Sequence, residues 1–208
     1  MYRCLLLLLL MAQASFAKDH KTLTYTGSRF VFKVFVTRGI SPENNGYVCG
    51  VDSIVIKEKG QPAFTQTIKC EDNGYRCHDT DKPDIVIEDM DFDGTEDIRL
   101  RQFLPPSPNI PYYYWLYNAK TKRFEPGRAL EAITTPVFDP KRKCITSSWK
   151  GSATEYGTTT YEYINEQPVK TEETTKMYSG DYVDIIIKKR VKNKLVVVSK
   201  ERKKVDEE

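Results

Sequence analysis

Residues 89–97 concentrate carboxylates in a pattern that suits a metal ion. The segment reads Asp-Met-Asp-Phe-Asp-Gly-Thr-Glu-Asp, with aspartates at its first, third, fifth and ninth positions. Calcium takes about six to eight oxygen ligands, which a curled chain supplies from alternate side chains and a backbone carbonyl. Gly94 suits the sharp turn because glycine adopts positive φ without steric cost. We predict a calcium loop whose ligands are four aspartate side chains and one threonine carbonyl: Asp89, Asp91, Asp93, Thr95 and Asp97.

The loop is not an EF-hand. Leu100 occupies the twelfth position, where that motif requires a bidentate glutamate. The flanking residues 84–88 and 98–101 are β-branched or alternate with period two, which predicts strands on both sides. A solvated acidic turn is the alternative, but crowded carboxylates without an ion would repel one another. We expect the ion to clamp the two strands and to hold the proline loop and tyrosine strand that follow.

A strand, a D-x-D-x-D-G-x-x-D loop and a second strand resemble the calcium loops of FG-GAP (integrin-type) and VCBS-type β-propeller repeats. The stretch from Asp84 to Glu125 contains VIEDMDFDGTEDIRL and YYYWLYNAKTKRFE. It is similar to a family of secreted bacterial proteins that carry one such loop, then an aromatic strand and hairpin. Some members are similar to periplasmic inhibitors, or immunity proteins, that protect a cell against peptidoglycan hydrolases. The resemblance implies a protein partner of that kind.

Residues 1–17 have the features of a secretory signal peptide. Arg3 supplies a positive start, residues 5–12 are apolar but too few to span a bilayer, and residues 15–17 (SFA) form a small-x-small cleavage site. We expect an exported protein, periplasmic or extracellular, with no transmembrane segment after cleavage. Residues 18–208 fit a single domain.

The charge balance argues against a nucleic-acid partner. Loss of Arg3 from 32 basic residues leaves 31 against 29 acidic ones, a net charge of +2. The basic runs at 188–190 and 202–204 are offset by acidic residues at the chain end. We interpret them as solvated strand faces and a charged tail of about residues 201–208.

Four cysteines remain after cleavage, an even number that suits an oxidising compartment and allows three pairings. A two-residue hairpin turn at 59–60 would place Cys49 opposite Cys70 and leave Cys77 for Cys144. A small loop closed by Cys70 and Cys77 is the alternative. No C-x-x-C motif occurs, so we do not expect thiol catalysis.

Period-two alternation along most of the chain predicts an all-β fold. Residues 30–36 place four large apolar side chains on one face, and Val31 and Phe35 suggest that the other face is covered too. The strands follow too closely for crossover helices, so we predict a single domain of antiparallel meanders, a small propeller-like array or a sandwich. Expected strands lie at 47–56, 63–68, 144–149, 158–164, 169–177, 182–190 and 195–200, with a hairpin turn at 192–193 and a short helical turn at 129–132.

The proline-rich segment 103–111 and the aromatic strand 112–117 are candidate recognition elements. Four prolines favour a stiff, extended loop. One alternate set of strand side chains should pack in the core, and the other could form a ligand platform or a second packed layer. The candidate partner-binding residues are Pro106, Pro108, Tyr113, Trp115 and Tyr117.

The sequence lacks the common catalytic motifs. It has two histidines and no zinc-protease, serine-hydrolase or P-loop pattern, and no carboxylate pair stands out as that of a glycosidase. We therefore predict a non-enzymatic calcium-binding module that binds another macromolecule and, by resemblance, inhibits a peptidoglycan hydrolase. A carbohydrate or cell-wall binding module is the alternative, and a hydrolase is the third hypothesis.

Overall fold

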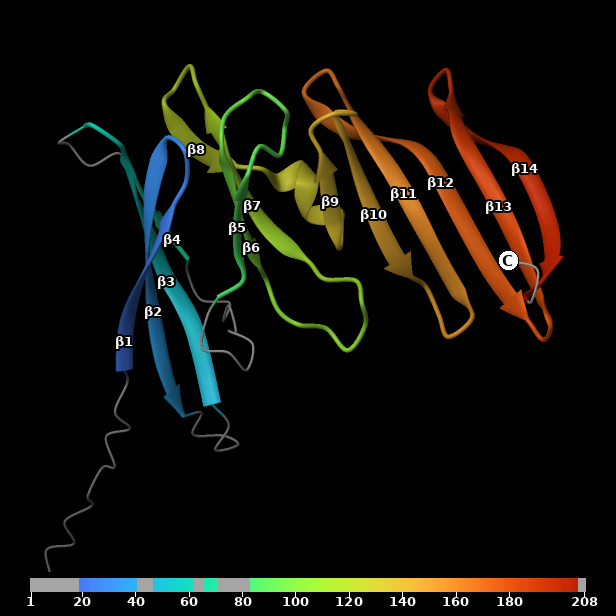
Figure 1. The fold of residues 1–208 in the computed structure, drawn as a ribbon, viewed down its shortest axis with the longest axis horizontal. Coiled ribbons are helices and arrows are strands. Elements are labelled where there is room, and N and C mark those ends of the chain that lie inside the picture. The colour runs from blue at the N-terminus through green and yellow to red at the C-terminus, as the bar shows by residue number, and fades with distance from the viewer. Residues whose placement is uncertain (1–18, 41–46, 62–65, 71–82, 206–208) are drawn as a thin grey trace, which may run out of the picture.

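The computed structural model describes residues 19–40, 47–61, 66–70 and 83–205. The predicted signal peptide and Cys77 lie outside them. Within the described residues the chain forms fourteen strands and one short 3-10 helix, which confirms the all-β prediction. The strands form three antiparallel sheets with the consecutive orders β1–β4, β5–β8 and β9–β14 (Figure 1). Each sheet is therefore a meander, as the short strand spacing predicted.

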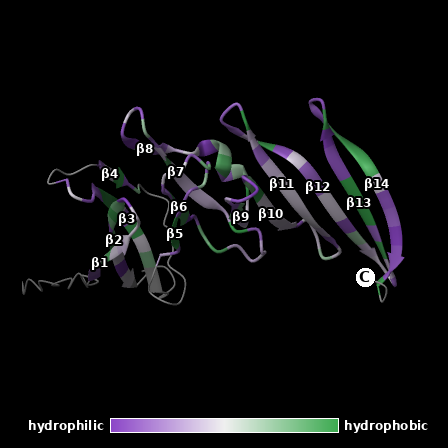
Figure 2. Cartoon of the chain, turned by 45° about the horizontal axis from the view of Figure 1, so that its top comes forward, coloured by the Kyte–Doolittle hydropathy of each residue, from purple (hydrophilic) through white to green (hydrophobic). Residues whose placement is uncertain are grey.

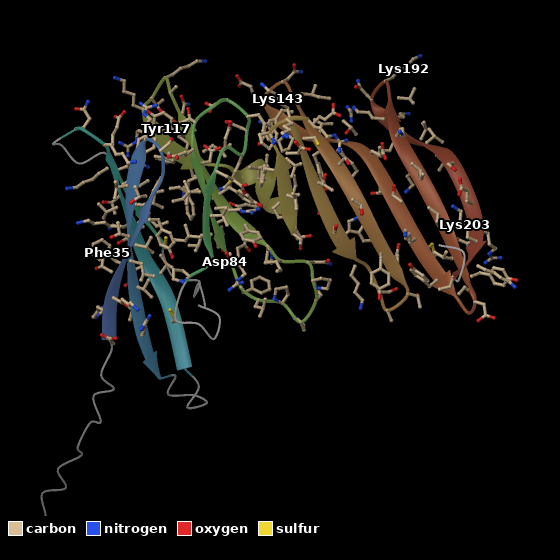
Figure 3. All side chains as sticks on the ribbon, in the orientation of Figure 1. Phe35, Asp84, Tyr117, Lys143, Lys192 and Lys203 are labelled. Atoms are coloured by element: carbon tan, nitrogen blue, oxygen red, sulfur yellow. The ribbon has the colours of Figure 1, made fainter. Side chains whose placement is uncertain are left out.

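The first sheet contains β1 (Asp19–Thr26), β2 (Phe30–Ile40), β3 (Tyr47–Glu58) and β4 (Gln66–Lys69). The four inward residues of β2 are at most 1% exposed, as the period-two pattern predicted. The prediction that the other face is covered is wrong. Phe35 on that face is 38% exposed (Figure 3), because this sheet is an outer layer.

The β3–β4 pairing differs from the predicted register. A two-residue turn at 59–60 would pair Ile54 with residue 65, whereas Ile54 pairs with Ile68. β3 ends at residue 58, and the described part of β4 begins at residue 66. Each β4 residue is therefore displaced along β3 from its predicted partner.

This register changes the cysteine positions. The N–H of Cys70 donates to the carbonyl of Asp52 (2.9 Å), so Cys70 does not face Cys49. The thiols of Cys70 and Cys144 are free, and Cys49 is disulfide-bonded. The predicted Cys49–Cys70 and Cys77–Cys144 pairs, and the Cys70–Cys77 alternative, are therefore wrong. Burial raises the pKa of Cys70 to about 12, which makes its thiol a poor nucleophile.

The second sheet is the middle layer of the molecule (Figure 1). It contains β5 (Ile85–Glu88), β6 (Asp97–Arg101), β7 (Tyr112–Asn118) and β8 (Arg123–Pro126). One face packs against the first sheet and the other against the third, so both of its faces are apolar.

The third sheet has six strands and is preceded by the 3-10 helix η1 (Arg128–Ala132), which confirms the predicted helical turn. The hairpin turn at 192–193 is also confirmed. Only the first strands of this sheet lie against the middle layer (Figure 1). The strands are β9 (Pro136–Asp139), β10 (Cys144–Lys150), β11 (Glu155–Ile164), β12 (Gln167–Ser179), β13 (Tyr182–Val191) and β14 (Lys194–Lys204).

Two apolar cores fill the spaces between the three sheets. Alternate residues of β7 belong to different cores, because successive side chains point to opposite faces of a strand. The first core, between the first and second sheets, includes Phe30, Ile54, Ile98, Tyr117 and Phe124. The second core, between the second and third sheets, includes Met90, Tyr112, Tyr114, Leu130 and Ile145.

Gln66 joins the first two sheets through two buried hydrogen bonds. Its amide nitrogen donates to the carbonyl of Phe124 (2.9 Å), and its amide oxygen accepts the N–H of Phe124 (2.8 Å).

Among the described residues, no helix has the length and apolar character that a membrane crossing would need.

Gln66→Ala should lower the free energy of unfolding by about 2–3 kcal/mol, because it leaves both backbone groups of Phe124 buried without partners. Urea denaturation measures this change. Gln61→Ala, at an exposed position near the same hairpin, is the control and should shift stability by less than about 0.5 kcal/mol. Equal effects of the two substitutions would contradict the role of Gln66.

Candidate metal centre

The acidic loop connects β5 to β6 and is closed by its own carboxylates. The N–H of Asp93 donates to Oδ1 of Asp89 (3.1 Å) and of Asp91 (3.2 Å), and the N–H of Gly94 donates to Asp89 Oδ2 (2.9 Å). The N–H of Thr95 donates to Asp93 Oδ1 (2.7 Å). Gly94 has a φ of +93°, which confirms the predicted sharp turn. These bonds fix the aspartate side chains relative to the loop backbone.

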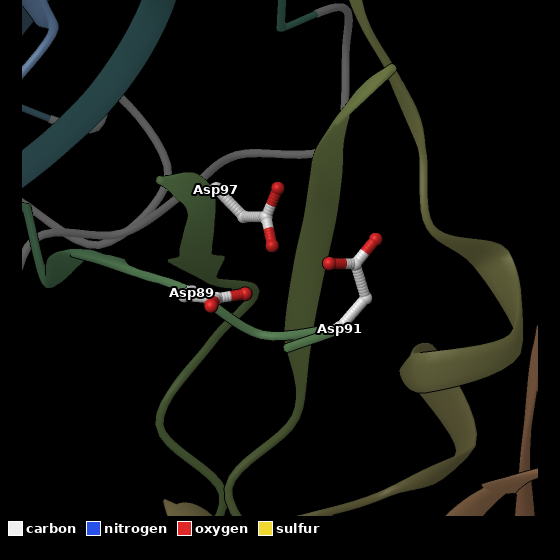
Figure 4. Close-up of side chains that lie close together, drawn as sticks. All are labelled: Asp89, Asp91 and Asp97. Atoms are coloured by element: carbon white, nitrogen blue, oxygen red, sulfur yellow. The ribbon is translucent and has the colours of Figure 1, made fainter. Parts of the chain in front are cut away.

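Three of the carboxylates converge (Figure 4). One oxygen from each of Asp89, Asp91 and Asp97 lies within 4.8 Å of the others. Asp97 is fully buried, and its two oxygens accept the N–H groups of Met90 and Tyr117, each at 2.8 Å. Asp97 therefore ties the loop to both β6 and β7.

Burial raises the pKa of two of these carboxyls. The pKa of Asp97 rises to about 8 because burial outweighs its two N–H bonds, and the charges of Asp91 and Asp93 add to the rise. The pKa of Asp91 rises to about 6 through burial and the nearby charge of Asp93. Metal-free, the cluster retains protons near neutral pH. A cation would instead stabilise the charged carboxylates.

The donor set fits a hard cation. All three converging groups offer carboxylate oxygen, which calcium and magnesium prefer. Asp93 is exposed and lies outside the cluster of three, and Thr95 contacts Asp93 through its N–H. Ligation by Asp93 and by the carbonyl of Thr95 stays a prediction.

Two apolar residues inside the loop attach it to the second core. Met90 is fully buried there. Phe92 has a φ of +64° and packs its ring against Phe138 (6.3 Å between centroids) and Tyr163 (5.9 Å). Sequence reasoning did not single out either residue. Their apolar character within an acidic segment is the signal that could have identified them.

Glu96 attaches the loop to the first sheet. Its carboxylate accepts the N–H of Ser28 and the N–H of Arg29 (3.2 Å), both in the β1–β2 turn. A Cβ at Gly27 would overlap this carboxylate, so the close approach requires glycine. The acidic loop therefore contacts all three sheets.

A pocket of about 540 Å³ opens beside the loop. Its lining includes Asp91 and Asp93 together with Lys120, Tyr163 and Glu166. The hydroxyl of Tyr163 is buried and has no hydrogen-bond partner among the described residues. The carboxylates are thus reachable from the surface through this pocket.

The proline loop lies at the opposite end of β6 from the acidic loop (Figure 1). An ion in the acidic loop would therefore act on the proline loop through the strands between them, and the expectation that it holds the proline loop and the tyrosine strand stays a prediction. The proline loop has its own anchors. Asn109 donates to the carbonyl of Lys150 (2.9 Å) and accepts its N–H (2.8 Å), and the Thr135 hydroxyl bonds with Ile110 N–H (3.0 Å) and the Pro108 carbonyl.

The first part of the proline loop, which follows β6, exposes large apolar side chains. Phe103 and Leu104 are each 49% exposed, and Pro106 and Pro108 are exposed beside them. The sequence analysis included Phe103 and Leu104 in the candidate segment 103–111 but named only the two prolines as contact residues. Two apolar residues directly before a proline cluster are the signal that could have identified them.

The aromatic strand β7 offers no free platform. Tyr117 is only 3% exposed, and its ring contacts Phe30 (5.0 Å between centroids) and Phe124 (5.2 Å). Tyr113 and Trp115 pack against the same core. The prediction of Tyr117 as a partner-binding residue is therefore wrong, and the interpretation as a second packed layer is confirmed.

Comparison with known proteins adds only a fold likeness. No protein-family model and no curated protein matches the chain. A solved structure described as "Structure of a Xanthomonas Type IV Secretion System related protein" is similar, with a TM-score of 0.54 and 16% identity. The similarity covers 86% of this chain and 93% of that one. At this identity, the match supports the fold alone.

The raised carboxyl pKa values give stability a specific pH dependence. The pKa of Asp97 in the folded chain, about 8, exceeds its ordinary value of 3.8. Between these pH values the folded, metal-free chain therefore binds more protons than the unfolded chain. With a chelator, stability should therefore fall as pH rises from about 4 to 8. With calcium this fall should vanish, because the ion replaces the protons. Thermal midpoints measured across the range test this.

Asp91→Asn should shrink the fall between about pH 4 and 6, since it removes one titrating carboxyl. Asp181→Asn, in the exposed β12–β13 turn, is the control and should leave the profile unchanged. A profile that is flat with chelator would contradict this account of the cluster.

Proposed function

We propose that the chain is an exported, calcium-binding β protein that acts by binding another macromolecule and not by catalysis. The anchored proline loop carries this proposal. Its base is fixed by Asn109 and Thr135, while Phe103 and Leu104 extend into solvent. Large apolar side chains on a pre-organised loop favour binding, because little conformational entropy is lost on contact.

Calcium has a structural role in this proposal. Asp89, Asp91 and Asp97 would hold the ion, with Asp93 and Thr95 as further ligands. The bound ion supplies positive charge that keeps the buried carboxylates ionised. The loop residues themselves fasten the three sheets. Asp97 accepts one N–H from the loop and one from β7, while Glu96 contacts the first sheet and Phe92 the third.

A peptidoglycan hydrolase is the proposed partner. The support is the sequence resemblance across residues 84–125. A protruding, stiff, apolar loop suits the concave substrate cleft of such an enzyme. Occupation of that cleft would block the substrate.

A cell-wall glycan binding module is the second candidate. A pocket of about 350 Å³ beside Pro108 favours it. Trp149 and Tyr156 line this pocket together with hydroxyl side chains, including Ser148 and Thr158. Aromatic rings with nearby hydroxyl groups suit sugar ligands.

Inhibition assays against a panel of muramidases and related glycosidases test the first candidate. The double change Phe103→Asp, Leu104→Asp should weaken inhibition by about tenfold or more, because it puts charges into a desolvated contact. Val137→Asp is a matched control, since Val137 is a highly exposed apolar residue on β9, and it should leave inhibition unchanged. If no enzyme of the panel is inhibited but the protein is retained on peptidoglycan, the glycan-binding candidate replaces the inhibitor.

Calorimetric titration of chelator-treated protein tests the metal. Calcium should bind the native chain, and the double change Asp91→Ala, Asp93→Ala should abolish binding because it removes two carboxylates from one loop. Asp181→Ala, in an exposed turn of the third sheet, should bind calcium normally. A thermal midpoint that calcium does not move would rule out the structural role.

A further inference from the structure

The far end of the third sheet is uncovered. Strands β12–β14 extend beyond the middle layer (Figure 1), and neither core includes any of their residues. β14 is the last strand of this sheet, so one edge of its backbone has no neighbouring strand among the described residues. Nine of its eleven residues are exposed. Such a long free edge has unpaired backbone groups that can bind another strand.

The first half of β14 is apolar and exposed. Val196, Val197 and Val198 are 40%, 48% and 51% exposed, and Val191 lies across the hairpin turn from them. A register shift leaves Val198 with no opposite residue on β13. Figure 2 shows this change along β14, from apolar near the turn to hydrophilic toward its end. Adjacent exposed valines on a sheet edge indicate a contact surface.

The second half of β14 is basic. The strand as a whole carries five lysines and arginines and one glutamate. Arg202 pairs with Asp184 (3.0 Å) and Lys203 with Glu201 (3.0 Å). Within the described part of the chain, no carboxylate forms an ion pair with Lys194, Lys200 or Lys204. Positive charge at this edge therefore remains available.

This charge pattern selects among the occupants of the edge. A second copy of β14 would bring another strand with five basic residues and one acidic residue to the same edge, which is electrostatically less favourable than an acidic strand. A lipid bilayer is a poor occupant, because an open sheet edge cannot satisfy its backbone groups in hydrocarbon. An extended acidic polypeptide supplies carboxylates for the lysines and backbone hydrogen-bonding groups for the free edge.

We propose that the free edge of β14 binds an extended, acidic segment of a partner protein, which adds to the third sheet as its next strand. Backbone hydrogen bonds along the edge supply affinity, apolar side chains of the segment cover the exposed valines, and its carboxylates pair with Lys200 and Lys204. This surface lies apart from both the proline loop and the acidic loop, so it goes beyond the function proposed above.

Fluorescence anisotropy with synthetic peptides and the full chain tests the proposal. A ten-residue peptide of alternating valine and glutamate should bind, with an affinity that falls as salt is raised. The matched valine–lysine peptide should bind at least about tenfold more weakly. Two further peptides carry N-methyl groups on one or the other alternate set of amides. One of them should bind more weakly by a similar factor, because strand addition needs the N–H donors on one side of the peptide.

Charge reversal locates the site. Lys200→Glu with Lys204→Glu should weaken binding of the acidic peptide about tenfold or more. Lys141→Glu with Lys143→Glu, on the exposed β9–β10 turn, is the matched control and should leave it unchanged (Figure 3 labels Lys143). Circular dichroism should confirm that both variants fold.

Four results would overturn the proposal. One is equal binding of the acidic and basic peptides, and another is unchanged binding of both N-methylated versions. A dimer of the chain alone that the Lys200/Lys204 change disrupts would assign the edge to a second copy. Flotation with anionic vesicles, without peptide affinity, would assign it to a membrane surface.

Discussion

The buried carboxylate of Asp97 is the interaction on which the rest of the middle layer depends. It occupies the first position of β6, accepts one N–H from the acidic loop and another from the end of β7, and lies beside two further carboxylates. Removing such a charge from water is costly, and the raised pKa of Asp97 reflects that cost. The same cost makes a cation at this position a means of stabilising the fold. The chemistry of the loop and the packing of the sheets are therefore linked through one side chain.

The layered arrangement determines where recognition can occur. Because the middle sheet is covered on both faces, its aromatic strand contributes to two cores. Strand ends and sheet edges are among the surfaces that remain exposed. The proline loop is one of these, and it extends from the end of β6 opposite the acidic loop. The open edge of β14 is another.

These positions separate stabilisation from recognition. The acidic loop contacts all three sheets through Phe92, Glu96 and Asp97, so it is placed to hold the layers together. The proline loop depends on Asn109 and Thr135 for its shape and has no contact with the carboxylate cluster. A change at one site should therefore act on the other only through the stability of the whole domain. This is the expected design of a binding module, in which a rigid scaffold presents exposed loops.

The sequence by itself determined the local features: the alternating strands, the meander topology, the turn at Gly94 and the helical turn before β9. Each depends on neighbouring residues, through side-chain alternation or backbone sterics. Only the tertiary structure decided the β3–β4 register, the cysteine environments, the two-sided burial of β7 and the separation of the two loops. These features depend on the register between strands and on which sheet covers which face. The alternation of side chains along β7 does not show whether one of its faces is buried or both are. Tyr117 is an example. The alternation of β7 predicted which side chains share its face, but its burial depends on Phe30, which is far away in the sequence, and on Phe124 of the next strand.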